Sequence, residues 1–533
     1  MNLERGSVEA PQEYDAIIVG AGINSLACAV HLGAKGWRVG VFEQANTAGG
    51  AVKTLELTEP GFRHDWAAMN LSLFAGSGFF KAHGEDLIGR GLEFAPASHC
   101  FASVFEDGKW LGVSTGTGES RTRIAGFSEN DAKAWDKLCE EFPGTAEYVF
   151  ALLGNPMQMH IQGKILAKAL FRKGFSWTAG LARLLLSSPR KWLTETFESD
   201  HVRATMAAWG MHLDFAPDMA GGAVFPYLEA MANQNFGMVI GKGGADTVTR
   251  ALLSKIQSSG GEVHCGKRVT RVLRTGGKAS GVELEDGSQI KASRTVIANV
   301  APEGLMKLLD GASGDAVFDT KMAKFTHAPG TMMIHLALDG LPDWSASEEL
   351  KTFAYVHIAP SLDQMARTYQ QAVAGLLPDE PVLVVGQPTT VDPSRAPEGK
   401  HVLWVQVRMV PGEIRGDAAG KITETDWAVV KEIYADRALD MIERHAPGLK
   451  AKIISRAVVS PLDLEADNPN LVGGDQVAGS HHLSQNFLFR PAFGHATGKT
   501  PVDGLHLTGA SVWPGAGTGA GAGFMLAQKL GGK

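Results

Sequence analysis

Two glycines, a serine and a glutamate near the start of the sequence have the spacing of a dinucleotide-binding motif. Gly20, Gly22 and Ser25 occupy the three small-residue positions of a G-x-G-x-x-G turn, and Glu43 follows Gly20 by 23 residues. In such turns the glycines allow a tight bend and a close approach of the backbone to a pyrophosphate, while the acid accepts hydrogen bonds from ribose hydroxyls. The motif therefore predicts a dinucleotide cofactor.

The neighbouring residues supply the elements that must position this turn. Residues 14–19 form an apolar, β-branched run typical of a buried parallel strand, and residues 39–42 form a second one. Between them, residues 23–35 predict a helix, whose first backbone N–H groups at Ile23 and Asn24 favour a phosphate. The alternative is a glycine turn that merely joins a strand to a helix, but such a turn does not require an acid after the second strand.

Histidines and aspartates in three short segments are the candidates for proton transfer. A histidine titrates near neutral pH, which suits it to general acid–base catalysis. In the alternative interpretation Asp65 caps a turn, His64 lies on the surface and the histidine pair makes loop hydrogen bonds. The candidates are His64 and Asp65 in "GFRHDWAA", His481 and His482 in "GSHHLSQNFLFRP", and His212 and Asp214 in "GMHLDFAP".

The bulk composition excludes several functional classes. The chain has 533 residues, which is too long for one hydrophobic core and favours two domains. A net charge of −7 gives no basic signature for nucleic acid. The four cysteines are scattered, which argues against a metal site or a redox disulfide and favours a reducing, cytoplasmic compartment. The polar N-terminal stretch is not typical of a signal peptide, and no apolar run is long enough to predict a membrane span.

Several separate segments resemble the phytoene desaturase-like family of FAD-dependent oxidoreductases. Residues 44–54 ("QANTAGGAVKT") are similar to its paired-glycine extension, residues 241–302 to its second FAD-binding segment, and residues 503–530 to its glycine-rich C-terminal motif. Residues 399–411 and 442–476 resemble the branch that includes pyridine nucleotide-disulfide oxidoreductase domain-containing protein 2.

The resemblance implies that FAD is the cofactor and assigns residues to it. Gly49 and Gly50 would let a second backbone segment reach the pyrophosphate, and Ala51 stands where the family often carries an arginine. The backbone at Val269 would meet the adenine, and the last helix would direct its N-terminus at the flavin edge that gains negative charge on reduction. The further implied contacts are Gln44, Gly509, Ala510, Pro514, Gly515 and Thr518.

The same resemblance implies an α/β fold with a discontinuous cofactor domain. Its glutathione-reductase-like, FAD-binding Rossmann domain would combine residues 12–75, 235–302 and 470–533. The insertions, residues 76–234 and 303–469, would build an α+β substrate domain with an antiparallel sheet. Apolar runs at 331–337, 353–358 and 402–410 are its expected strands.

The family's usual reaction is the desaturation of a CH–CH bond with hydride transfer to flavin N5, which implies a lipophilic or amphipathic small-molecule substrate. Trp66, Phe225, Arg490 and Trp513, which replaces the family's usual histidine, are expected in the substrate pocket. The alternatives are an amine or alcohol oxidase that uses O2, a double-bond isomerase or saturase, and a flavoprotein scaffold without turnover. The absence of a second dinucleotide motif for NAD(P)H argues against pyridine-nucleotide disulfide reductases and flavin monooxygenases. The expected electron acceptor is O2 or a quinone.

One basic stretch suggests contact with a membrane. Residues 164–191 carry seven basic residues and no acid among leucine, isoleucine, phenylalanine and tryptophan. A basic amphipathic helix of this kind can lie on an anionic membrane surface, which would place a cytoplasmic protein at the inner face of the membrane. The alternative is a helical lid whose lysines and arginines face solvent. Assembly into a homo-oligomer is a further expectation.

Overall fold

A seven-stranded sheet gathers three distant parts of the chain. In the computed structural model, which describes residues 13–517 and 519–532, the strand order is β10-β11-β12-β1-β2-β9, with β20 paired to β12. Strand β1 is parallel to β2 and β12, and β20 is parallel to β12, whereas β10, β11 and β12 form an antiparallel meander. The strands are β1 (Glu13–Val19), β2 (Val39–Phe42), β9 (Glu262–His264), β10 (Val269–Thr275), β11 (Lys278–Leu284), β12 (Gln289–Ala298) and β20 (Leu505–Leu507).

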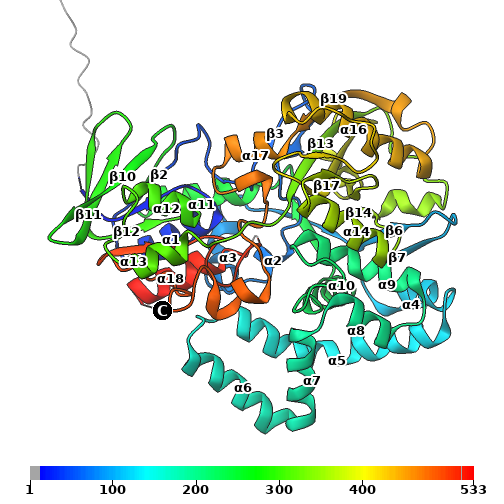
Figure 1. Ribbon diagram of the computed structural model, residues 1–533, viewed down its shortest axis with the longest axis horizontal. Coiled ribbons are helices and arrows are strands. Elements are labelled where there is room, and N and C mark those ends of the chain that lie inside the picture. The colour runs from blue at the N-terminus through cyan, green and yellow to red at the C-terminus, as the bar shows by residue number, and fades with distance from the viewer. Residues whose placement is uncertain (1–12, 518, 533) are drawn as a thin grey trace, which may run out of the picture.

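Helices cover both faces of this first sheet (Figure 1). One face packs against α1 (Ile23–Ala34), α11 (Asp246–Ser258) and α18 (Gly521–Gly531), with Leu26, Leu252 and Leu526 in a shared core. The other face packs against α12 (Pro302–Leu308) and α13 (Ala316–Met322). Buried on both faces, β1 and β2 take the continuous apolar sequence that parallel strands require.

A second seven-stranded sheet, in the order β19-β13-β17-β16-β14-β6-β7, lies beside the first (Figure 1). Its pairings are antiparallel except for β14 with β6. Nearly every side chain of β13 and β17 is buried, because α16 (Trp427–His445) packs on one face and α10 (Val224–Phe236) closes the other. The strands are β6 (His99–Val104), β7 (Trp110–Ser114), β13 (Gly330–Leu338), β14 (Tyr355–Ile358), β16 (Val382–Gly386), β17 (His401–Val410) and β19 (Ile453–Val459).

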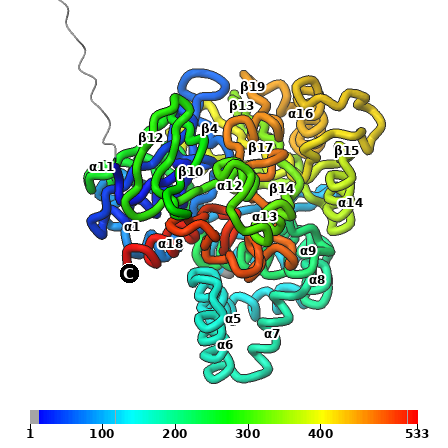
Figure 2. Tube along the Cα trace, turned by 60° about the vertical axis from the view of Figure 1, so that its left-hand side comes forward, coloured from blue at the N-terminus to red at the C-terminus, as the bar shows by residue number. Residues whose placement is uncertain are grey.

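A group of helices between residues 117 and 207 packs beside the second sheet. In both views α6 and α7 project from the body of the molecule as a helical arm (Figures 1 and 2). The basic stretch at 164–191 does not form one helix. It is interrupted at Gly174, whose φ is +85°, where α6 ends and α7 begins. The helices are α4 (Thr117–Ala125), α5 (Glu129–Leu153), α6 (Met159–Lys173), α7 (Phe175–Leu186), α8 (Pro189–Thr196) and α9 (Asp200–Ala207). Within the described part of the chain, none of the helices has the length and apolarity needed to cross a membrane.

Short elements connect the two sheets. The pair β3–β4 carries His64 and Asp65, and the pair β5–β8 joins residues 94–97 to residues 238–241. The remaining strands and α-helices are β3 (Thr54–Leu55), β4 (His64–Asp65), β5 (Phe94–Ala97), β8 (Met238–Gly241), β15 (Leu376–Leu377), β18 (Gly416–Asp417), α2 (Ser72–Ala75), α3 (Gly78–Ile88), α14 (Leu362–Val373), α15 (Pro388–Val391) and α17 (Pro461–Asp467), and the 3-10 helix η1 (Ala208–His212) lies near the second sheet. The predicted α/β class with an antiparallel second sheet is confirmed.

Candidate active site

The glycine turn after β1 and the loop after β2 form a cradle at the carboxyl edge of the first sheet. Gly20 has a φ of +86°, which residues with a side chain rarely adopt. Gly22 pairs with Gly49 as an isolated parallel bridge, and a Cβ at Gly50 would lie 3.1 Å from the Gly22 Cα. The two backbone segments can touch only because these positions are glycines.

An uncapped helix and a carboxylate line this cradle. Helix α1 begins at Ile23 with Gly22 as its N-cap, and no side chain caps its first N–H groups. Glu43 accepts the Ala21 N–H at 2.6 Å through Oε2 and the Ala45 N–H at 2.8 Å through Oε1. The helix N-terminus suits a phosphate, and the fixed carboxylate beside it suits ribose hydroxyls.

Asn299, which directly follows β12, is a site residue that sequence reasoning missed. Its Nδ2 donates to Ser25 Oγ at 2.8 Å, which gives a role to the serine at the third motif position. A Cβ on Gly509 would overlap with its Oδ1, and a Cβ on Gly20 would lie 3.2 Å from its carbonyl oxygen. Asn299 thus joins the glycine turn to the C-terminal loop. The only signal in the sequence is a polar residue placed directly after a buried strand.

A cavity of about 660 Å³ includes this cradle and continues into a chamber bordered by the second sheet and η1. Ser25, Gly509, Pro514 and Gly515 do not line it but belong to the turns that do, and Thr518 lies outside the described residues. The predicted cofactor residues that line it are Gly20, Gly22, Ile23, Asn24, Glu43, Gln44, Gly49, Gly50, Ala51, Val269 and Ala510.

Comparison with known proteins establishes the family. Residues 26–428 match the family of flavin-containing amine oxidoreductases. The chain belongs to this family. It is 26% identical to rat pyridine nucleotide-disulfide oxidoreductase domain-containing protein 2, over 96% of this chain and 92% of the rat protein. It is 24% identical to the neurosporene-forming phytoene desaturase of Rhodobacter capsulatus, over 97% and 93% of the two chains. The solved structure of cyclohexylamine oxidase from Brevibacterium oxydans shares the fold, with a TM-score of 0.60, 16% identity, and coverage of 98% and 99%.

Family membership makes the protein an FAD-dependent oxidoreductase, and it confirms the resemblance and the cofactor inferred from sequence. The cradle fits FAD on its own geometry. Side chains at Gly20, Gly22 and Gly50 would crowd Asn299 and the opposing glycine backbone, and so would push apart the segments that form the cradle. The first turn of α1 leaves donors for the oxygens of a pyrophosphate. Glu43 and Val269 border the same space, where the ribose and adenine would lie.

Aromatic side chains from three separate elements line the chamber beyond the cradle. Trp209 of η1, Tyr355 of β14 and Trp404 of β17 border it, with ring centroids 6.1 Å apart for Trp209–Tyr355 and 5.9 Å for Tyr355–Trp404. The indole Nε1 atoms of Trp209 and Trp404 are buried and lack a partner among the described residues. Buried indole N–H groups without a partner are unusual in folded proteins. Sequence reasoning missed all three, because no local motif links residues so far apart.

Arg408 and two glutamines form the polar wall of this chamber. The guanidinium donates to the Met211 and His212 carbonyls at 3.1 and 2.7 Å and to Thr331 Oγ1 at 2.8 Å. Gln476 Oε1 accepts from Arg408 at 3.2 Å and from Gln406 at 2.9 Å. Burial lowers the pKa of Arg408 to about 10, so the side chain remains charged at neutral pH. Its donors are directed at the protein, which makes Arg408 a positioning residue for η1.

Glu229 of α10 also lines the chamber, and its pKa is shifted upward from the usual value of a glutamate. Burial raises its pKa to about 7, although the residue retains some accessible surface where it borders the cavity. Such a carboxyl gains or loses its proton near neutral pH. The sequence shows that the residue is a glutamate, but it does not show the burial that raises the pKa.

The raised pKa of Glu229 predicts a pH-dependent contribution to stability. A carboxyl whose pKa is higher in the folded than in the unfolded protein stabilises the fold at low pH and loses that contribution as the pH rises. Urea unfolding at pH 5 to 8 should therefore show wild type losing up to about 3 kcal/mol relative to Glu229→Gln. If the free energies of unfolding of the two proteins changed equally with pH, the pKa of Glu229 would not be raised in the folded protein.

The predicted acid–base pair His481 and His482 lies outside the cavity lining. His481 is buried, and its Nε2 accepts the Ala516 N–H at 3.2 Å. Burial also lowers its pKa well below the usual value, so it stays neutral and holds the loop that borders the cavity. His482 Nε2 lies 3.0 Å from the Tyr369 hydroxyl and 3.5 Å from Asp214, in a cluster that anchors the same loop. His212 alone of the histidine candidates lines the chamber, paired with His357 at 3.1 Å.

His64 and Asp65 are neither surface nor turn residues, because both are buried in β4. Asp65 forms an ion pair with Arg395 at 2.5 Å and accepts the Ala245 N–H at 2.8 Å. His64 Nε2 lies 2.8 Å from Thr58 Oγ1, and burial lowers its pKa to about 4. Neither side chain lines the cavity, so the structure gives them a role in packing in place of proton transfer.

The four residues expected in the substrate pocket also lie away from its lining. Trp513 donates to the Asn155 carbonyl at 3.0 Å, and Phe225 stacks on Phe215 with centroids 4.7 Å apart. The Trp66 ring lies near the Lys53 ammonium, 5.5 Å from its centroid. Arg490 is fully buried and donates to the Ala510 and Ser480 carbonyls at 2.8 Å, which fastens two loops that do border the cavity.

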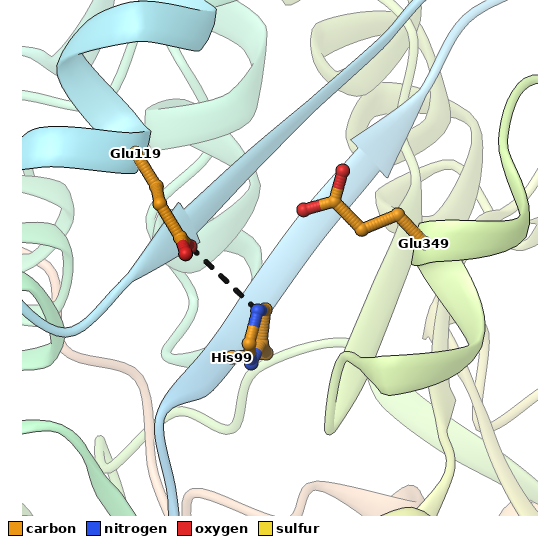
Figure 3. Close-up of side chains that lie close together, drawn as sticks. All are labelled: His99, Glu119 and Glu349. Carbon is orange, nitrogen blue, oxygen red and sulfur yellow. Dashed lines mark ion pairs between the residues drawn. The ribbon is translucent and has the colours of Figure 1, made fainter.

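One cluster of a histidine and two glutamates has the spacing of metal ligands (Figure 3). His99 Nε2 lies 3.6 Å from Glu119, and Glu349 faces the same space. Arg123 pairs with both carboxylates, at 3.2 Å with Glu119 and more closely with Glu349. The guanidinium supplies the positive charge there, so the cluster is an ion-pair network on the protein surface.

Proposed function

We propose that this FAD-dependent oxidoreductase dehydrogenates a CH–CH bond of an amphipathic or lipophilic small molecule. One observation carries the proposal: the cofactor cradle and the aromatic chamber are parts of a single cavity, which residues of both sheets line. Apolar side chains dominate its inner wall, including Leu73, Leu213 and Met69. The similarity to phytoene desaturases over nearly the whole chain supports the same reaction class.

The protein's contribution to this reaction is binding and orientation. Bound FAD would supply the acceptor for a hydride from one substrate carbon, and the neighbouring carbon would lose a proton as the C=C bond forms. The glycine cradle and Glu43 fix the nucleotide, while Arg490 and His481 hold the loops at Ala510 and Ala516 against the cavity. Trp209, Tyr355 and Trp404 would surround an apolar substrate in the same cavity as the cradle and would exclude water from it.

Anaerobic mixing of the holoprotein with candidate substrates tests this proposal. We expect fatty acyl compounds or polyenes to bleach the flavin absorption, and the reaction product to contain a new C=C bond. Readmission of air or addition of a soluble quinone then distinguishes O2 from a quinone as the acceptor. Bleaching by amines alone, with a carbonyl product, would replace the proposal by an amine oxidase. Absence of bleaching by all classes would refute it.

The arm of α6 and α7 supports a second part of the proposal, that the protein takes its substrate from an anionic membrane on the cytoplasmic side. Phe171 and Phe175 at its bend are 88% and 79% exposed. Lys164, Lys168 and Arg172 lie on the same arm. Exposed aromatic side chains next to basic ones are the features of a helix that enters the headgroup region of a bilayer.

Removal of the two phenylalanines should weaken binding to phosphatidylserine-containing vesicles. Each buried phenylalanine contributes about 1.5–3 kcal/mol, so Phe171→Ser with Phe175→Ser should reduce sedimentation with vesicles by at least about tenfold. Val317→Ser, at a similarly exposed position on α13, is the matched control. Equal sedimentation of the three proteins, or no sedimentation of wild type at low salt, would contradict membrane contact.

A further inference from the structure

The carboxyl of Glu229 has no protein partner within the described structure. Its backbone carbonyl accepts from Asn233 at 2.8 Å, but no hydrogen bond or ion pair from a described residue reaches its side-chain oxygens. Other buried carboxyls in this part of the protein accept more than one hydrogen bond. Asp214, for example, accepts from Tyr369 and Ser480 at 2.8 and 2.7 Å. An unpartnered carboxyl in a protein interior is costly unless a ligand or water satisfies it.

Among the described residues, Arg408 is the positively charged residue on the chamber side of the cavity, and its donors are already committed to other partners, whereas Arg268 and Lys307 line the cavity on the side of the first sheet. Arg408 directs its donors at two carbonyls, Thr331 and Gln476, and Glu229 is not among its partners. Lys53, at the cradle, is bound to Asp467 at 2.7 Å. A negative charge on Glu229 is therefore left for a bound molecule to neutralise.

The rings around Glu229 restrict what that molecule can be. Tyr355 and Glu229 both line this chamber. Burial raises the pKa of the Tyr355 hydroxyl, and the charges of Asp65 and Glu229 add to that shift. Trp209 and Trp404 complete the aromatic wall of the chamber. Aromatic faces and a carboxylate both attract an organic cation, and they attract it more strongly when water is excluded.

We propose that Glu229 is a specificity-determining residue of the chamber and that it receives a cationic group of the substrate, an ammonium or quaternary amine. The inference rests on the proposed function, because it takes the chamber to be the substrate site. It narrows the substrate class to an amphipathic molecule with a cationic end in the chamber and an apolar portion that extends to the cofactor.

The titratable groups around Glu229 keep their charge state near neutral pH, so we expect Glu229 to determine how binding of the cation depends on pH. Burial lowers the pKa of His212 and of His357 well below neutrality, and it raises that of Tyr355 far above. Arg408 stays charged up to about pH 10, and Asp65 remains paired with Arg395. Between pH 5.5 and 8, Glu229 is thus the group facing the chamber that gains a negative charge.

Three eight-carbon probes that differ in charge test the inference: octyltrimethylammonium, octanol and octanoate. The quaternary amine keeps its charge at every pH. Binding to the holoprotein is measured by calorimetry and by perturbation of the flavin absorption, at pH 5.5 and pH 8. We expect the cation to bind at least about tenfold more tightly than octanol at pH 8, and most of this preference to vanish at pH 5.5.

The variants Glu229→Gln and Glu140→Gln complete the experiment. Glu229→Gln should abolish the preference for the cation and leave octanol binding unchanged. Glu140 is exposed on the neighbouring α5, so its variant removes an equal charge outside the cavity and should keep the preference. The inference would be overturned if Glu229→Gln still bound the cation more tightly than octanol. It would also be overturned if wild type showed no such preference at pH 8. If Glu229→Gln fails to fold, the wild-type pH dependence decides. Because binding requires no turnover, these outcomes are independent of whether dehydrogenation is observed.

Discussion

Replacement of Gly523 by alanine should release FAD and destabilise the protein by about 3 kcal/mol or more. Within a helix this substitution normally stabilises by about 1 kcal/mol. Here a Cβ would overlap with the carbonyl oxygen of Asn24, where α18 crosses α1 and the Gly523 N–H donates to Asn24 Oδ1 at 3.1 Å. The steric conflict is with backbone, so it can be relieved only by moving α18 away from the turn that begins α1.

Gly521→Ala provides the matched control for this prediction. It lies two residues earlier in the same helix, and its Cβ would meet Pro514 at 3.4 Å, an ordinary contact. We expect Gly521→Ala to keep its flavin absorption and Gly523→Ala to lose most of it, with thermal unfolding measured on both. Equal FAD content and equal melting temperatures would show that the close approach of the two helices is unimportant.

Arg395→Met should cost about 3–5 kcal/mol, because it leaves buried carboxylates without their counter-charge. Arg395 is fully buried and binds Asp65 at 2.5 Å, Asp392 at 3.3 Å and the Gly241 carbonyl at 2.5 Å. These partners lie on β4, beside η3 (Pro393–Arg395) and at the end of β8, so a single side chain fastens three segments. Urea unfolding measures the loss.

The variant Arg63→Met is the control for loss of a positive charge, because Arg63 forms a nearby ion pair with Asp246. The paired atoms are 3.6 Å apart and Arg63 is partly exposed, so Arg63→Met should change the free energy of unfolding by less than about 1 kcal/mol. A loss of similar size in both variants would contradict a special role for the buried ion pair.

Local sequence patterns were sufficient to predict the first part of the site. The run from β1 through the glycine turn to Glu43 is continuous in the chain, and its chemistry depends on backbone shape that glycine and spacing reveal. The apolar runs at 331–337, 353–358 and 402–410 were also predicted as strands, and the structure has strands at 330–338, 355–358 and 401–410.

The chamber could not be predicted in the same way. Glu229, Tyr355 and Trp404 come from a helix and two strands separated by long stretches of sequence, and only the tertiary fold gathers them. Conversely, Trp513 and Arg490 follow family-like motifs, but their partners are carbonyl groups of neighbouring loops. A pattern shows that an aromatic or charged residue is buried, whereas it does not show whether that residue faces a cavity or the packed core.

The pairing of β20 with β12 and of α18 with α1 constrains when the protein can acquire its cofactor during synthesis. The Gly523–Asn24 contact joins residues 499 positions apart, so the first glycine turn must wait for the end of the chain. At roughly 5–20 residues per second, a ribosome needs about 25–100 s to supply those residues. Once β12 has been made, its edge at residues 296–298 stays unpaired until β20 is synthesised, and an unpaired strand edge is open to incorrect partners. A nascent chain that stops short of α18 would have made nearly the whole protein and still be unable to retain FAD.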